Sequence, residues 1–149
     1  MGAALVTGAA RRLGRAMALA LAGRGIDVAI HYNGSSDEAE ATAAEARALG
    51  VKAVTLAADL LDEAQVAPLV GRASQALGAP LTVLINNASI FEYDRIDTAT
   101  RAGWDRHMES NLRAPFVLTQ AFAAQAPRAD MSDGEPRAQA LVINMIDQR

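Results

Sequence analysis

The chain has no cysteine and only one lysine, Lys52, among its 149 residues. The lack of cysteine excludes disulfide bonds and thiolate chemistry, and it favours a reducing, cytoplasmic setting. Any reaction that needs a lysine from this chain must use Lys52. No apolar run is long enough to cross a bilayer, and the first residues lack the charged and apolar regions of a signal peptide. We therefore expect neither membrane insertion nor secretion.

An excess of positive charge is also lacking, since 14 basic and 17 acidic residues leave a formal net charge of −3 at pH 7. Non-specific binding to nucleic acid or to an anionic membrane surface depends on a basic excess, so neither is an expected partner. What the chain does have is hydrophobic residues, 51% of the total, mostly alanine, leucine and valine. This length and composition predict one domain, residues 1–149, with a substantial core.

Apolar segments of strand length alternate along the chain with alanine-rich segments of helical length. This order predicts an α/β fold, a Rossmann-type doubly wound parallel sheet with right-handed crossovers and helices on both faces. A complete sheet of this type has about six strands, so we expect this one to be truncated after its fifth strand. The polar residues 128–137 are expected to form a surface loop. The expected strands are residues 3–7, 27–32, 52–57, 81–86 and 140–145, and the expected helices are residues 13–24, 36–49, 63–77 and 100–125.

The first predicted strand runs directly into a glycine-containing turn and then into a helix. Residues 7–14 read Thr-Gly-Ala-Ala-Arg-Arg-Leu-Gly, with Gly8 and Gly14 at the two ends of the turn. Such a turn directs backbone N–H groups and the positive end of the helix dipole at a diphosphate, with no side chain in the way. The strand–turn–helix order, followed by a second strand, predicts a dinucleotide-binding unit.

The end of the second predicted strand indicates which dinucleotide is bound. Enzymes that prefer NAD place an acidic residue about twenty residues after the turn, where it binds the ribose 2′-hydroxyl. Here residues 31–36 read His-Tyr-Asn-Gly-Ser-Ser, and the first acid is Asp37. Hydroxyl and amide groups tolerate a 2′-phosphate, and Arg11 or Arg12 would reach it as a cation. We therefore expect NADPH, with His31 either in contact with the cofactor or half-exposed at the strand end.

Four motifs, each on the expected element, resemble the short-chain dehydrogenase/reductase family over the whole chain. The first is the turn at residues 7–14, and the second is Ala-Asp-Leu at residues 58–60, whose aspartate contacts the adenine in that family. The third is Asn-Asn-Ala-Ser at residues 86–89. The fourth is Asn111 in the long helix, which in the family anchors a water that relays protons to the catalytic lysine. The resemblance implies an oxidoreductase that uses a nicotinamide cofactor.

Three departures from the family pattern resemble its pteridine reductase branch. Arg12 replaces the middle glycine of the turn, Ser89 the last glycine of the third motif, and Asp147 the active-site serine after the fifth strand. In that branch the segments read Thr-Gly-Ala-Ala-x-Arg-Leu-Gly, Asn-Asn-Ala-Ser-x-Phe and Asn-Met-x-Asp. The resemblance implies reduction of the C=N bond of a dihydropterin or dihydrofolate. It also implies that Arg12 approaches both cofactor and pterin, and that Asp147 holds the active-site tyrosine.

Further residues belong to the same expected site. Phe91 would stack on a heteroaromatic substrate beside the nicotinamide, or it is an ordinary core residue. Ala88 is small enough for the backbone to approach the cofactor closely. The expected catalytic residues are Asn111 and Asp147, and the expected substrate-binding residues are Arg12, Ser89, Phe91 and Asp147. The expected cofactor-binding residues are Gly8, Arg11, Arg12, Leu13, Gly14, His31, Tyr32, Asn33, Ser35, Asp59, Leu60, Asn87, Ala88 and Ser89, and no metal site is expected.

The tyrosine and lysine that complete the chemistry in this family are missing. The family protonates its product with a tyrosine in a Tyr-x-x-x-Lys motif, where the lysine lowers the tyrosine pKa. Tyr32 and Tyr93 are the only tyrosines, and neither begins such a motif. We therefore expect the chain to be the N-terminal part of a longer reductase, an inactive relic, or one half of a nicked protein. In the last case a second chain would carry the C-terminal half.

Two other functions fit the same residues: a carbonyl reductase of the family acting on a ketone or aldehyde, and a non-catalytic nucleotide-binding module. The expected partners are a small-molecule substrate and further copies of the chain. The family resemblance implies a dimer or tetramer in which the long helix, ending near Gln125, packs against its mate. Trp104 and Met108 share one face of that helix and are expected to pack inside the domain.

Overall fold

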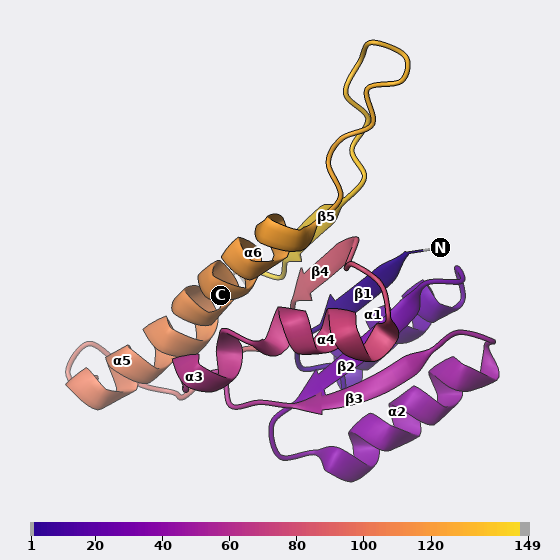
Figure 1. Ribbon diagram of the computed structural model, residues 1–149. Helices are drawn as coiled ribbons and strands as arrows, with labels where there is room; N and C mark the ends of the chain where they lie inside the picture. The colour runs from indigo at the N-terminus through magenta and orange to yellow at the C-terminus, as the bar shows by residue number, and fades with distance from the viewer. Residues whose placement is uncertain (1, 147–149) are drawn as a thin grey trace.

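The computed structural model describes residues 2–146, in which five parallel strands form one sheet in the order β3-β2-β1-β4-β5 (Figure 1). The strands are β1 (Ala3–Val6), β2 (Asp27–Tyr32), β3 (Ala53–Ala57), β4 (Val83–Asn86) and β5 (Leu141–Asn144). The predicted parallel sheet is confirmed, and no strand end differs by more than two residues from its expected position. Asp147, an expected catalytic residue, lies outside the described residues.

Helices cover both faces of the sheet, as expected. Their bounds are α1 (Arg12–Ala22), α2 (Ser36–Ala48), α3 (Glu63–Val66), α4 (Leu69–Leu77), α5 (Arg101–Met108) and α6 (Ala114–Gln125), with a π-helical segment η1 (Glu109–Arg113) before α6. One core lies between the sheet and α1 with α2, and the other between the sheet and α3, α4 and α6. In β1, Leu5 faces the second core and Val6 the first, so this strand is covered on both sides. Within residues 2–146 no helix is long and apolar enough to span a membrane.

Two of the expected helices are not continuous. The segment 63–77 forms two helices, because Pro68 lacks the N–H that a continuous helix would donate to the carbonyl of Ala64. The segment 100–125 is interrupted by η1. There Pro115 has no N–H to donate to the Asn111 carbonyl in a regular helix, which accounts for the wider turns just before it. Both proline signals were present in the sequence.

Lys52, expected within the third strand, lies just before β3 instead. Its Nζ donates a hydrogen bond of 3.2 Å to the carbonyl of Leu77, the last residue of α4. A cation at a helix C-terminus interacts favourably with the helix dipole. The single lysine of the chain therefore has a structural role at the end of α4.

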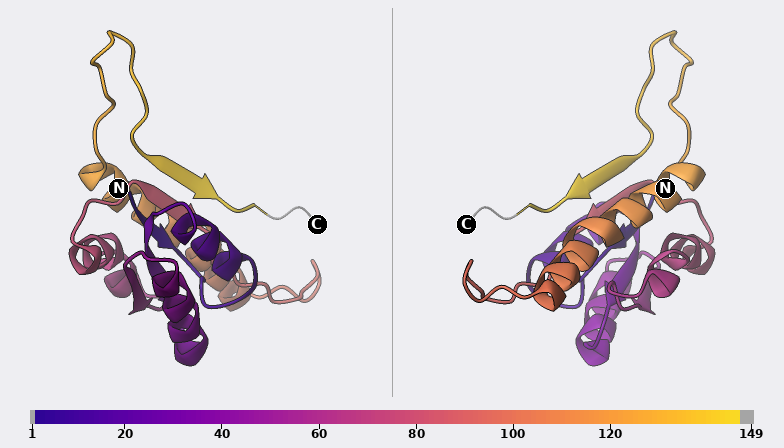
Figure 2. Two further views of the ribbon diagram at one scale, coloured as in Figure 1. Left: turned by 90° about the vertical axis from the view of Figure 1, so that its right-hand side faces the viewer. Right: turned by 90° about the vertical axis from the view of Figure 1, so that its left-hand side faces the viewer.

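Between α6 and β5 the chain leaves the body of the domain as a narrow arm, which Figure 2 shows standing away from the sheet and helices. Asp130 and Arg137 pair across it through two backbone hydrogen bonds of 2.9 and 2.8 Å. Gly134 turns the chain near the tip with φ +82°. The expectation of an exposed polar loop at residues 128–137 is confirmed.

Candidate functional site

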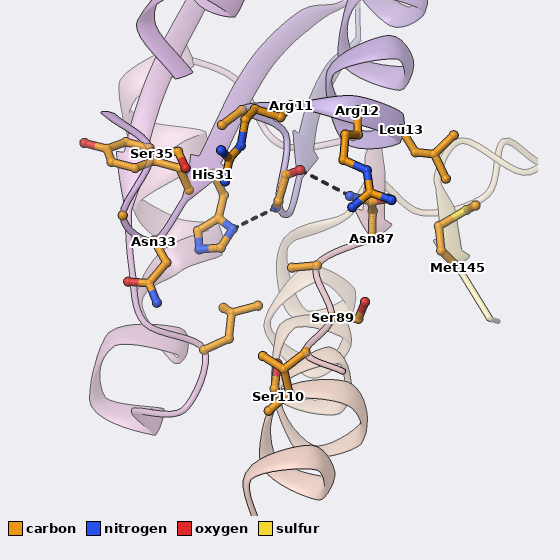
Figure 3. A pocket seen from close by; sticks show the side chains of 18 of the residues that line it. Arg11, Arg12, Leu13, His31, Asn33, Ser35, Asn87, Ser89, Ser110 and Met145 are labelled. Atoms are coloured by element: carbon orange, nitrogen blue, oxygen red, sulfur yellow. Dashed lines mark hydrogen bonds between the residues drawn. The ribbon is translucent and has the colours of Figure 1, made fainter. Parts of the chain in front are cut away.

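A cavity of about 730 Å³ opens at the carboxyl ends of β1, β2 and β4. The strand order reverses between β1 and β4, and ligands of open α/β sheets bind at such a switch point. The cavity volume is typical of small-molecule sites. Figure 3 shows the turn after β1 on one side and the segment after β4 on the other. Its lining is Gly8, Ala10, Arg11, Arg12, Leu13, Gly14, His31, Tyr32, Asn33, Gly34, Ser35, Asp59, Leu60, Leu61, Asn87, Ala88, Ser89, Ile90, Arg106, Ser110, Met145 and Ile146.

Every residue expected to bind the cofactor lines this cavity. Of the expected catalytic and substrate-binding residues, Arg12 and Ser89 also line it, whereas within residues 2–146 Phe91 and Asn111 are not part of its lining. The sequence reasoning missed Arg106 and Ser110, which reach the cavity from the long helix. Ser110 lies next to Asn111 in sequence, but no local pattern marked which face of the helix would meet the cavity.

The turn between β1 and α1 is held by close backbone approach. Gly8 has φ +62°, and a Cβ on it would lie 3.0 Å from the Cα of Ala88. A Cβ on Gly14 would lie 2.2 Å from the carbonyl oxygen of Gly8. Arg12 also adopts a left-handed conformation, with φ +54°, which residues with a Cβ rarely adopt. The turn therefore needs glycine at both ends and tolerates a strained arginine between them.

The first two N–H groups of the turn do not face the cavity as free donors, contrary to the expectation for this motif. Gly8 N–H donates to Nδ1 of His31 at 3.1 Å, and Ala9 N–H donates to the His31 carbonyl at 2.9 Å. His31 thus accepts the hydrogen bonds of both N–H groups, those of Gly8 and Ala9, with its ring and its carbonyl. Any anion in the cavity must be bound by the later part of the turn.

The start of α1 supplies those remaining donors. The hydrogen bond from Arg15 N–H to the Arg11 carbonyl is the first turn of the helix, so the N–H groups of residues 12–14 precede it. These groups carry the positive end of the helix dipole into the cavity lining. Arg11 adds a guanidinium that pairs with Glu38 at 3.4 Å. Both side chains are exposed, so this ion pair holds the guanidinium only weakly. This arrangement suits a phosphate group.

The segment after β4 is clamped to the turn by Thr7, a residue that the sequence reasoning did not assign to the site. Its hydroxyl oxygen accepts hydrogen bonds from the N–H groups of Asn87 and Ala88, at 2.9 and 3.0 Å. In return, Asn87 Nδ2 donates to the carbonyls of Thr7 and Gly8, at 2.9 and 3.3 Å. Thr7 belongs to the glycine-turn motif, but its contact with the segment after β4 is visible only in the structure.

His31 is not half-exposed, so that alternative is wrong. It is 2% exposed, and both of its ring nitrogens have partners: Gly8 N–H at Nδ1, and the Ala58 carbonyl at 3.0 Å from Nε2. Burial lowers the pKa of His31, a shift that the Ala58 carbonyl opposes and the positive charge of Arg72 reinforces. The ring is therefore neutral and fixed beneath the turn.

Asn111 uses its side chain to hold the segment that follows β4. Its Oδ1 accepts from the N–H of Ile90 and its Nδ2 donates to the carbonyl of Ile90, both at 2.9 Å. One turn earlier, His107 Nε2 accepts the N–H of Glu92 at 3.0 Å. Asn111 and His107 of the long helix thus hold residues 90–92 in place. The water relay expected of Asn111 stays a prediction.

Several aromatic and apolar side chains are more exposed than expected. Phe91 is 68% exposed, so the core alternative for it is wrong, and its stacking on a substrate stays a prediction. Trp104 is 64% exposed, and Met108 is partly exposed, so their packing inside the domain is also wrong. With Leu112 and Phe116 they recur every fourth residue, which places all four on one face of the α5–η1–α6 rod. We refer to this face as the apolar stripe.

Comparison with known proteins agrees with this architecture. The family model described as short chain dehydrogenase matches residues 2–144. The chain belongs to the short-chain dehydrogenase family. Among curated proteins, the 3-oxoacyl-[acyl-carrier-protein] reductase FabG of Staphylococcus aureus is 36% identical over 125 residues. That alignment covers 84% of this chain and 50% of the relative, so the chain spans about half the length of the curated relatives it matches.

Solved structures of other proteins superpose closely on the chain. FolM alternative dihydrofolate reductase 1 from Brucella suis, in complex with NADP, is 38% identical with a TM-score of 0.85, covering 98% of this chain and 57% of its own. A short chain dehydrogenase from Burkholderia cenocepacia, also in complex with NADP, is 36% identical with a TM-score of 0.82, covering 93% and 59%. The Rossmann-type sheet of the chain thus corresponds to a part of each of these two structures.

Proposed function

We propose that this chain is the cofactor-binding part of an NADPH-dependent short-chain reductase. The observation that carries the proposal is the start of α1, where the N–H groups of residues 12–14 and the guanidinium of Arg11 meet at the cavity. Asn33 and Ser35 line the cavity just after β2. Their amide and hydroxyl groups tolerate a 2′-phosphate, which a carboxylate at this place would repel. When bound, NADPH would supply the hydride. The complexes of the Brucella and Burkholderia proteins with NADP support this choice of cofactor.

The proposed substrate is a pteridine, reduced at a dihydropterin or dihydrofolate-type C=N bond. Arg12, Ser89 and Phe91 follow the pattern of the pteridine reductase branch, and Arg12 and Ser89 line the cavity. The name of the Brucella relative, an alternative dihydrofolate reductase, supports the same class. Asn111 would anchor the relay water and Asp147 would hold the tyrosine of the full-length enzyme. The tyrosine and lysine themselves would come from the remaining length that the relatives possess.

A second candidate is a carbonyl reductase, favoured by the 36% identity to a 3-oxoacyl-[acyl-carrier-protein] reductase. The two are separated by following the oxidation of NADPH by the full-length protein with dihydropteridines, 3-oxoacyl thioesters and simple ketones. We expect turnover with dihydropteridines, and much slower turnover with NADH in place of NADPH. Turnover confined to carbonyl substrates would overturn the pteridine assignment. NADPH binding without turnover of any of them would favour the third alternative, a non-catalytic module.

The proposed oligomer uses the apolar stripe. Monomeric proteins seldom expose a contiguous set of large apolar side chains, and such a set marks an interaction surface. Trp104, Met108, Leu112 and Phe116 form this set on the α5–η1–α6 rod. We propose that a second copy of the chain covers it, as the family resemblance implies for the long helix.

Replacing Arg12 with glycine is expected to move stability and binding in opposite directions. Glycine adopts φ +54° without steric penalty, so the free energy of unfolding should rise by about 0.5–1 kcal/mol. NADPH affinity should fall about tenfold or more, because the forked guanidinium beside the diphosphate is lost. Urea unfolding and calorimetric titration measure the two effects. Arg12→Lys, which keeps both the charge and the strain, should leave stability near the wild-type value; a glycine variant that binds as tightly as wild type would contradict the assigned role.

A further inference from the structure

One buried side chain joins three of the segments that line the cavity. His31 is the penultimate residue of β2, and its ring accepts the Gly8 N–H of the turn after β1 (Figure 3). On its other side the ring contacts the carbonyl of Ala58, which precedes Asp59 in the segment after β3. The diphosphate side and the adenine side of the expected cofactor site are thus connected through a single imidazole.

The partners of the ring define its protonation state. Gly8 N–H can only donate and the Ala58 carbonyl can only accept, so Nδ1 must carry a lone pair and Nε2 the proton. Burial opposes a second proton and lowers the pKa of His31, and Arg72 of α4 acts in the same direction. The charged residues that line the same cavity as His31 are Arg11 and Arg12 in the turn, Asp59 after β3 and Arg106 of α5.

Adding a proton would place two donors against each other. In the imidazolium, Nδ1–H would face the N–H of Gly8, and Gly8 would have to turn away. Gly8 cannot turn alone, because its carbonyl lies against Gly14 and accepts from Asn87 Nδ2. Displacing Gly8 therefore displaces the start of α1, which carries the remaining N–H donors of the site.

We propose that neutral His31 is a positioning residue, which holds the glycine turn in the shape that receives the cofactor diphosphate and weakens dinucleotide binding when it is protonated. This inference rests on the proposed function, since it assumes a dinucleotide in the cavity. It assigns no role in catalysis to His31.

The same link makes folding depend on pH in a defined direction. Because the pKa of His31 is lower in the folded than in the unfolded chain, the unfolded chain takes up the proton first. The stability contributed by the neutral ring is therefore complete above the ordinary histidine pKa of about 6.5 and is lost as the pH falls from there through the folded-state pKa.

The test uses the full-length protein and three variants: His31→Asn, His31→Leu and His107→Asn. Asparagine keeps an acceptor near Gly8 but does not titrate, whereas leucine removes the acceptor. His107 is the only other histidine of the chain, so its variant is the matched control. NADPH and NADH dissociation constants are measured from about pH 8 to about pH 5, together with urea unfolding. NADH lacks the 2′-phosphate of NADPH, a group that itself titrates with a pKa of about 6. A loss of NADH affinity on acidification therefore cannot come from that phosphate.

Wild type and His107→Asn should lose NADH affinity by about tenfold or more on acidification, whereas His31→Asn should lose little. His31→Leu should bind about tenfold more weakly even at about pH 8, because the Gly8 N–H loses its acceptor. An acid loss in His31→Asn equal to that of wild type would overturn the inference, as would wild-type binding by His31→Leu. Failure of every protein to bind either dinucleotide would overturn the proposed function instead. The urea unfolding data would then test the role of His31. If the free energy of unfolding depended on pH equally in wild type and His31→Asn, the link between His31 and the turn would be overturned.

Discussion

Replacing Gly14 with alanine is expected to abolish measurable dinucleotide binding and to destabilise the fold. The added Cβ would lie 2.2 Å from the Gly8 carbonyl oxygen and 2.6 Å from Asn87 Nδ2. Neither atom can retreat freely, because the first is backbone and the second donates to two carbonyls. Overpacking of this kind costs about 1–3 kcal/mol. A shift of α1 would also remove charge-assisted hydrogen bonds to the diphosphate, each worth about 1.5–3 kcal/mol, so affinity should fall at least about a hundredfold.

Gly71→Ala is the matched control for this variant. Gly71 lies inside α4, and a Cβ on it meets no other heavy atom of residues 2–146 within 4 Å. Alanine there should raise the free energy of unfolding by about 0.5–1 kcal/mol and leave NADPH binding unchanged. Urea unfolding and calorimetric titration of both variants make the comparison. If Gly14→Ala bound NADPH like wild type, the close contact between α1 and the turn would not be the reason for glycine at this position.

The sheet and its cavity could be predicted because they depend on patterns that are local in sequence. Apolar runs of strand length, separated by helical segments, imply parallel strands whose carboxyl ends meet at one edge. Residues that follow those strands, such as Gly8, Asn33, Asp59 and Ala88, must then converge, whatever the details of packing. This is why the expected cofactor residues all line the cavity.

Contacts between distant segments could not be predicted in this way. The bond from Gly8 N–H to His31 joins residues 23 positions apart, and those between Asn111 and Ile90 join residues 21 apart. Each depends on the depth of a side chain relative to a neighbouring strand or helix, which a sequence pattern does not define. For the same reason half-exposure stayed open as one of two alternatives for His31, and Trp104 was expected to be packed. The half-exposed alternative and the packing of Trp104 were both wrong.

Other differences between the expected and the observed structure are indicated by single residues in the sequence. Pro68 divides the helix expected over residues 63–77, and Pro115 accompanies the π-helical segment. Arg12 stands where the family has glycine, and a glycine position in a tight turn indicates a left-handed backbone. Its φ of +54° could therefore have been inferred from the departure itself.

Replacing Thr7 with valine is expected to lower the free energy of unfolding by about 2–4 kcal/mol. Valine has nearly the shape of threonine, so the change removes the hydroxyl and little else. Thr7 is 1% exposed, and its hydroxyl oxygen is the acceptor for the N–H groups of Asn87 and Ala88. A buried or partly buried donor left without an acceptor costs about 1–3 kcal/mol. Against a typical domain stability of about 5–15 kcal/mol, this loss is large.

Thr7→Ser separates the hydroxyl from the packing of the methyl group. Serine keeps the acceptor and loses one methyl group, which should cost only about 1 kcal/mol. Hydrogen exchange provides a local measurement, since the amides of Asn87 and Ala88 should exchange faster in the valine variant than in the serine variant. If serine destabilised the protein as much as valine, the methyl group and not the hydroxyl would hold the segment after β4. The clamp would then be a packing contact, and the shape of the cavity would depend on Thr7 only through its volume.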